Sequence, residues 1–113
     1  MAKSNKPVVW GLFAAGGTLT AFVTPVLVLL TLLPAFGVMP QLLSYDAMHA
    51  FAAHWTGKLL LFGLLFLMLW HAAHRLRITL HDFGLRADAA VAVAVYLAAA
   101  GGTICTLYFL LRI

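Results

Sequence analysis

Three long apolar stretches occupy most of this 113-residue chain, and they constrain its fold more than any other feature. They run from about residue 8 to 33, from 46 to 80 and from 87 to 111. A helix of the first length spans about 39 Å, which exceeds a hydrocarbon core of about 30 Å. Charged residues make up only 9% of the chain, whereas a soluble domain carries about 25%. The sequence therefore predicts an all-α membrane protein, a single domain with three transmembrane helices.

Prolines and short polar residues mark the ends of the predicted helices. Pro34, Gly37 and Pro40 are expected to end the first helix and to form the first loop. Ser44 and Asp46 are both suitable N-caps for the second helix, which we expect to continue without interruption to about residue 80. The first apolar stretch is too long for a cleaved signal peptide and shows no small-residue cleavage site.

The basic residues flank the apolar stretches and form no continuous stripe, which favours membrane orientation over nucleic-acid binding. Three spans place the two termini on opposite sides. One side holds five cations and the other holds two: Lys3, Lys6, Arg75, Arg77 and Arg86 against Lys58 and Arg112. By the positive-inside rule the N-terminus is cytoplasmic and the C-terminus lies outside, in the periplasm.

The sequence lacks the motifs of several functional classes. A single cysteine, Cys105, excludes an internal disulfide and a four-cysteine metal site. No acidic residue lies in the middle of a predicted span, which argues against a proton-driven transporter. There is also no nucleotide-binding loop and no nucleophile paired with a base.

The stretch PVVWGLFAAGG, residues 7–17, combines aromatic rings with small residues. Trp10, Phe13 and Gly17 share one helix face because they are three and seven residues apart. One interpretation is an interfacial anchor beside a close helix–helix contact. The other is one wall of a flat pocket, which suits a quinone headgroup because the ring needs aromatic contact and close backbone approach.

The stretch WHAAHRLRITLHD, residues 70–82, carries imidazole and guanidinium groups at the membrane boundary. His71, His74 and Arg75 lie on one helix face together with Ile78, and His81 lies near it. Such groups can bind lipid headgroups. They can equally hydrogen-bond the oxygens of a redox carrier and move protons, since histidine titrates near neutral pH.

The same histidine pair raises the question of haem ligation. His71 and His74 are three residues apart on one helix, so they cannot ligate one iron from opposite faces. A second helix would have to supply the other ligand. We therefore expect no haem and no metal site in this chain.

Taken together, these motifs resemble the family of fumarate reductase D subunits. The resemblance rests on PVVWGLFAAGG, on LSYDAMHAFA at residues 43–52, on Gly57-Lys58 and on HRLRITLHD at residues 74–82. It implies a non-catalytic anchor in the bacterial inner membrane, paired with a second anchor, the C subunit of fumarate reductase. It also implies that a flavoprotein and an iron–sulfur protein of the same complex carry FAD and the clusters. Such a complex oxidises menaquinol and reduces fumarate in anaerobic respiration.

The resemblance also implies a quinone site near the cytoplasmic face. The matching positions are Trp10, Phe13, Ala14 and Arg75, and His74 and His81 are candidates for a proton relay. Two departures from the family pattern involve these segments. Ala14 replaces a glycine that is frequent there, and Arg77-Ile78 replaces paired histidines.

Two alternatives remain open. One is a haem b-binding anchor subunit of succinate dehydrogenase, which an absorption spectrum would reveal. The other is a small transporter or a structural membrane protein, which would not co-purify with flavin and iron–sulfur subunits.

Overall fold

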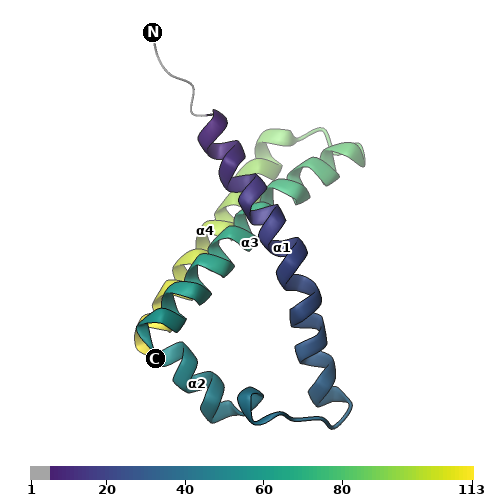
Figure 1. The fold of residues 1–113 in the computed structure, drawn as a ribbon. Coiled ribbons are helices and arrows are strands. Elements are labelled where there is room, and N and C mark those ends of the chain that lie inside the picture. The colour runs from purple at the N-terminus through teal and green to yellow at the C-terminus, as the bar shows by residue number, and fades with distance from the viewer. Residues whose placement is uncertain (1–5) are drawn as a thin grey trace.

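The computed structural model describes residues 6–113 and is built from helices joined by short connections (Figure 1). The elements in chain order are α1 (Lys6–Ala35), the 3₁₀ helix η1 (Gln41–Leu43), α2 (Tyr45–Ala53), α3 (Trp55–Asp82) and α4 (Asp88–Arg112). Within this range three helices, α1, α3 and α4, are long and apolar enough to cross a membrane, which confirms the prediction of three long apolar helices. Lys3, on which the predicted orientation partly depends, lies outside the described residues.

Glycines end helices α1 and α3 in the same way. Gly37 has φ 80° and Gly84 has φ 92°, a conformation that costs glycine little because it has no Cβ. After Gly37, the Val38 N–H donates to the Leu33 carbonyl at 2.8 Å. Gly37 itself donates to the carbonyl of Pro34 at 3.0 Å. This paired closure satisfies the last carbonyls of α1, so the helix ends at Ala35, two residues beyond the predicted limit.

The second predicted helix is interrupted, and the expectation of one continuous helix over residues 46–80 is wrong. The chain is extended at His54, with φ −75° and ψ 142°, so α2 ends at Ala53 and α3 begins at Trp55. The His54 imidazole accepts a hydrogen bond from the Thr56 N–H at 3.2 Å and caps the new helix. Gly57 allows the sharp turn, because a Cβ there would lie 1.7 Å from the carbonyl oxygen of Phe51.

The start of α2 is capped as the sequence indicated. The Ser44 hydroxyl accepts a hydrogen bond from the Ala47 N–H at 3.3 Å, which identifies Ser44 and not Asp46 as the N-cap. Asp46 lies in the first turn, where a carboxylate interacts favourably with the helix dipole.

Helix α1 crosses α3 at a pair of glycines (Figure 1). A Cβ on Gly16 would lie 2.6 Å from the Leu67 carbonyl oxygen, and a Cβ on Gly17 would lie 2.7 Å from the His71 ring. Gly11, in contrast, has nothing within 4 Å of its Cβ position. Close packing of small residues, which the sequence predicted for α1, therefore occurs at Gly16 and Gly17.

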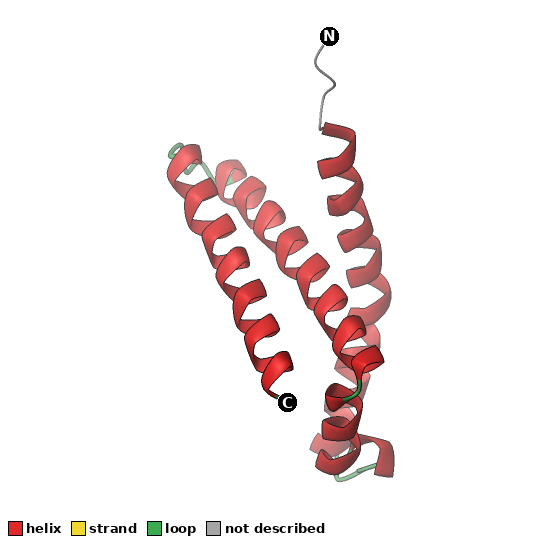
Figure 2. Ribbon diagram, turned by 90° about the vertical axis from the view of Figure 1, so that its left-hand side faces the viewer, coloured by secondary structure: helices red, strands yellow, loops and turns green. Residues whose placement is uncertain are grey.

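Helices α3 and α4 lie side by side and run in opposite directions (Figure 2). Their shared core consists of Ala73, Val95 and Ala99. In the first turn of α3, Lys58 donates a hydrogen bond from Nζ to the carbonyl of Leu110, near the end of α4. A lysine there satisfies a carbonyl that the helix itself leaves free and complements the negative end of its dipole.

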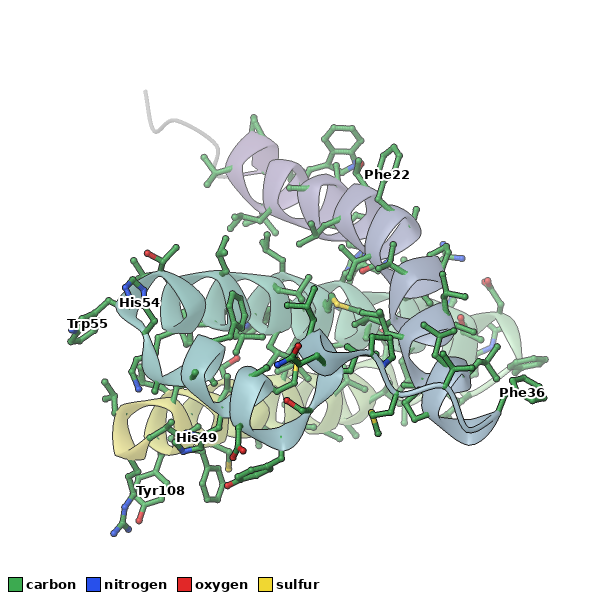
Figure 3. All side chains as sticks on the ribbon, turned by 60° about the horizontal axis from the view of Figure 1, so that its bottom comes forward. Phe22, Phe36, His49, His54, Trp55 and Tyr108 are labelled. Carbon is green, nitrogen blue, oxygen red and sulfur yellow. The ribbon has the colours of Figure 1, made fainter. Side chains whose placement is uncertain are left out.

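Most of the remaining surface is apolar and exposed, as expected for helices that face lipid. Figure 3 shows Phe22 and Phe36 pointing away from the helices, and their exposed fractions are 76% and 80%. Threonine hydroxyls inside the spans bond backward to their own helix, as Thr20 does to the Gly16 carbonyl at 2.7 Å. No hydroxyl donor is thereby left unpaired toward lipid at this position.

Candidate quinone site

A cavity of about 890 Å³ lies between the beginning of α1 and the facing parts of α3 and α4. Its lining is almost wholly apolar and aromatic, with a small number of polar groups. The lining residues are Lys6, Val9, Trp10, Leu12, Phe13, Phe66, Leu67, Trp70, His74 and Tyr96. This combination is typical of sites for flat organic ligands, in which apolar walls supply contact area and few polar groups set orientation.

Helix α1 contributes the aromatic wall that the sequence predicted. Trp10 and Phe13 both line the cavity, because their spacing places them on the same side of the helix. Trp10 as a residue is 69% exposed, so much of its apolar surface is free for contact. Phe13 is half-buried and is held from the other side by α3.

The side chain that holds Phe13 is His71. The two rings stack with centroids 4.7 Å apart, and His71 Nδ1 lies 3.2 Å from the Phe13 carbonyl oxygen. A ring nitrogen facing a carbonyl must carry the hydrogen, so His71 donates this bond. The geometry gives His71 a packing role between α1 and α3.

His74 belongs to a longer polar series. Its Nδ1 lies 2.9 Å from the Tyr96 hydroxyl on α4, and the edge of its ring meets Phe13 at a centroid distance of 4.6 Å. Arg77 donates from Nη1 to the same hydroxyl at 3.4 Å and lies over the Tyr96 ring. Arg77 also pairs with Asp88 through Nε–Oδ1 at 2.9 Å and Nη2–Oδ2 at 2.6 Å. The bidentate pair fixes the guanidinium plane.

Trp70 lines the cavity, and its indole N–H is buried and unpaired within residues 6–113. Its ring stacks on Tyr96 with centroids 5.9 Å apart. Among the described residues, its Nε1–H is the one buried side-chain polar group that has no hydrogen-bond partner. A buried donor without an acceptor costs about 1–3 kcal/mol, which the surrounding packing must offset.

The structure brings some of the predicted site residues together and separates others. Trp10, Phe13 and His74 meet at the cavity. Ala14 lies half-buried beside this wall and is not among the lining residues, and the exposed Arg75 lies outside it as well. His81 is exposed in the last turn of α3. No contact in the structure tests the quinone role of Arg75 or the relay role of His81, so both stay predictions.

Four residues of the site were missing from the sequence-based set: Trp70, Arg77, Asp88 and Tyr96. Spacing could have found two of them, because Trp70, His74 and Arg77 are separated by four and three residues and share a helix face. Tyr96 lies on α4, so no spacing within α3 connects it to His74. Asp88 contributes through a contact between two helices, which no spacing within one helix reveals.

Residues 6–113 contain no group of three or more histidine, cysteine, aspartate or glutamate side chains placed to hold a metal ion. Both Nδ1 atoms of the histidine pair are already engaged, that of His71 by Phe13 and that of His74 by Tyr96.

The fold and the cavity together define a class: a small all-helical membrane protein with three spans and an aromatic, histidine-containing site at one end. Comparison with known sequences then gives the family. Residues 1–111 match the family of the fumarate reductase D subunit, and the chain belongs to this family.

Individual relatives agree over most of the chain. The fumarate reductase D subunit of Aliivibrio fischeri (strain MJ11) is 38% identical over 113 residues, covering 98% of this chain and 94% of the relative. That of Shewanella sp. (strain W3-18-1) is 42% identical over 100 residues, covering 87% and 83%. That of Vibrio cholerae serotype O1 (strain M66-2) is 41% identical over 96 residues, covering 83% and 74%.

Proposed function

We propose that this chain is a membrane anchor of a menaquinol:fumarate reductase complex and that its cavity forms part of the menaquinol site. In such a complex menaquinol is oxidised to menaquinone, which releases two electrons and two protons. The electrons reduce fumarate to succinate on partner subunits, which hold the iron–sulfur clusters and FAD. A second anchor, the C subunit of fumarate reductase, completes the membrane part.

The composition of the cavity is the observation that carries this proposal. Trp10 and Phe13 line the cavity from α1, Trp70 lines it from α3, and Tyr96 lines it from α4. A naphthoquinone ring is flat and apolar with two oxygens, so it matches aromatic walls with few hydrogen-bonding groups. His74, whose ring lines the cavity, is a polar group available to such an oxygen.

The proposed orientation puts this cavity on the cytoplasmic side of the inner membrane. The N-terminal end of α1 and the turn between α3 and α4 lie at the end of the molecule opposite the C-terminus (Figure 1). Lys6, Arg77 and Arg86 belong to that end, and the positive-inside rule assigns it to the cytoplasm. A quinol bound there is close to the surface on which water-soluble redox subunits dock.

The test compares two tryptophans in the purified complex of all four proteins. Trp10 and Trp55 have nearly equal exposed fractions, 69% and 68%, and only Trp10 lines the cavity. We expect Trp10→Ala to raise the KM for a menaquinol analogue about tenfold, since aromatic contact and burial of the ring are both lost. Trp55→Ala should leave it unchanged.

Fumarate reduction driven by a soluble dye serves as the assembly control. It should survive in both variants, because the dye delivers electrons without the membrane site. Equal quinol kinetics in Trp10→Ala and the unmodified complex would contradict the proposed site. Failure of flavin and iron–sulfur subunits to co-purify with this chain would contradict the proposed function as a whole.

A further inference from the structure

We propose that Tyr96 and Arg77 are positioning residues that hold His74 as a hydrogen-bond donor, with Nε2–H facing the cavity. This inference rests on the proposed quinone site and adds the role of one group in it. It follows from the hydrogen-bonded series Asp88–Arg77–Tyr96–His74, which runs from the first residue of α4 to the cavity.

Two hydrogen bonds to Asp88 fix the orientation of Arg77. Asp88 binds its Nε and Nη2, so the guanidinium plane is fixed and the remaining Nη1 faces the Tyr96 hydroxyl. Asp88 is the first residue of α4, where the positive end of the helix dipole favours a carboxylate. The pair therefore fixes the turn and aims one N–H at Tyr96.

The Tyr96 hydroxyl has two hydrogen-bond partners among the described residues, Arg77 and His74, and their chemistry sets the direction of each bond. Arginine has donors and no acceptor, so the Tyr96 oxygen accepts from Arg77. The phenolic hydrogen then needs an acceptor of its own. Among residues 6–113 the hydroxyl has one other hydrogen-bond partner, Nδ1 of His74 at 2.9 Å. Tyr96 therefore donates to Nδ1, which must be unprotonated.

The other ring nitrogen of His74, Nε2, then carries the hydrogen. A neutral imidazole with an unprotonated Nδ1 carries its hydrogen on Nε2. His74 lines the cavity, and its Nε2 is neither buried nor bonded to any described residue. The site therefore presents an N–H donor to an acceptor oxygen, either the carbonyl of a quinone or the hydroxyl oxygen of a quinol.

This assignment separates two roles that histidine can have in a quinol site. A donor at Nε2 orients the ring by its oxygen and transfers no proton. The groups that accept the two protons released on oxidation then lie elsewhere in the complex. His74 fixes the position of the ligand between the aromatic walls.

Amide replacements of His74 test the donor directly in the intact complex. The side-chain nitrogen of glutamine reaches the place of Nε2, whereas that of asparagine reaches only the place of Nδ1. We expect His74→Gln to keep kcat and to raise the KM for a menaquinol analogue by less than about threefold. His74→Asn should raise KM about tenfold, the loss of roughly one hydrogen bond. An equal fall in kcat in both variants would show that His74 exchanges a proton and would overturn the proposal.

A second comparison tests the positioning role of Tyr96. Tyr96→Phe removes the donor to Nδ1 and should raise KM about fivefold with kcat nearly unchanged. Tyr108→Phe is the matched control, because Tyr108 is on the same helix and its hydroxyl also bonds an arginine, Arg112, away from the cavity. An unchanged KM in Tyr96→Phe would overturn the proposal.

The variants distinguish failure of the quinone site from failure of the positioning role of Tyr96. If Trp10→Ala impairs quinol kinetics while Tyr96→Phe does not, the quinone site stands and the positioning role falls. If neither variant has an effect, the site itself is wrong. Dye-driven fumarate reduction shows whether each variant complex is assembled, and the His74 pair decides the question if Tyr96→Phe fails to assemble.

Discussion

His71 and Phe13 contact each other both through their rings and through a hydrogen bond to the backbone. The imidazole stacks on the phenyl ring at 4.7 Å, and its Nδ1 donates to the Phe13 carbonyl oxygen at 3.2 Å. The contact joins α3 to α1 where the two helices cross. It also fixes the ring that forms one wall of the cavity, so the stability of the crossing and the shape of the site depend on the same side chain.

Loss of this contact should weaken the crossing. His71→Ala removes a ring stack of about 0.5–1.5 kcal/mol and a hydrogen bond of similar size, so we expect a destabilisation of about 1–3 kcal/mol. Thermal unfolding of the detergent-solubilised complex measures it. His81→Ala is the control, since His81 is exposed in the last turn of α3 and should change stability by less than about 0.5 kcal/mol. Equal melting temperatures for the two variants would show that the crossing does not depend on His71.

The glycines of α1 should respond to alanine in opposite ways. In Gly16→Ala the new Cβ meets the Leu67 carbonyl oxygen at 2.6 Å, a backbone atom that cannot move aside, so we expect a loss of about 1–3 kcal/mol. Gly11→Ala meets nothing within 4 Å and should be neutral or stabilising by up to about 1 kcal/mol, because alanine favours helix. Resistance to proteolysis in detergent ranks the two variants. The reverse order would contradict the close approach of α1 to α3.

The bend between α2 and α3 depends on Gly57. A Cβ there would lie 1.7 Å from the Phe51 carbonyl oxygen, so Gly57→Ala must open the bend, at a cost of about 2 kcal/mol or more. Gly63→Ala, farther along α3, has nothing within 4 Å of the new Cβ and serves as control. Hydrogen exchange of residues 45–53 should be faster in Gly57→Ala alone. Unchanged exchange would mean that α2 does not need the bend.

The proposed orientation can be measured with single cysteines at the two ends of α4. In a Cys105→Ser background, Ala87→Cys and Ile113→Cys each place a thiol at an exposed position. We expect a membrane-impermeant maleimide added to spheroplasts to label Ile113→Cys, and to label Ala87→Cys only after lysis. Labelling of Ala87→Cys in intact spheroplasts would reverse the orientation and place the cavity on the periplasmic side.

The sequence pattern of the second span predicted its helical character but not its interruption. The apolar character of residues 46–80 predicted a membrane helix, and the structure has a helix long and apolar enough to span a membrane over Trp55–Asp82. The interruption at His54 was not predicted, because nothing between Tyr45 and Thr56 disfavours a helix. The bend arises from the contact of Gly57 with Phe51, and periodicity within a segment carries no information about such a contact.

In the site, too, the sequence predicted residues within one helix and missed contacts between helices. Trp10, Phe13 and His74 were predicted from spacing and from the family resemblance, and they meet at one cavity. Arg75 was chosen from the same resemblance, yet Arg77 is the guanidinium that joins the polar series. Residues two apart on a helix point to nearly opposite sides, and α4 lies on the side of Arg77, where Asp88 and Tyr96 bind it.

The sequence by itself determined that this chain has three membrane-crossing helices, because lipid offers no partner for backbone N–H and C=O groups and each apolar stretch must satisfy its own. It also determined the aromatic wall of α1, since spacing along one helix fixes which side chains share a face. Only the tertiary structure decided that Arg77, Tyr96 and His74 form one polar series. Their contacts depend on how α3 is rotated against α4, and that rotation is set by the packing of Ala73 against Val95 and Ala99.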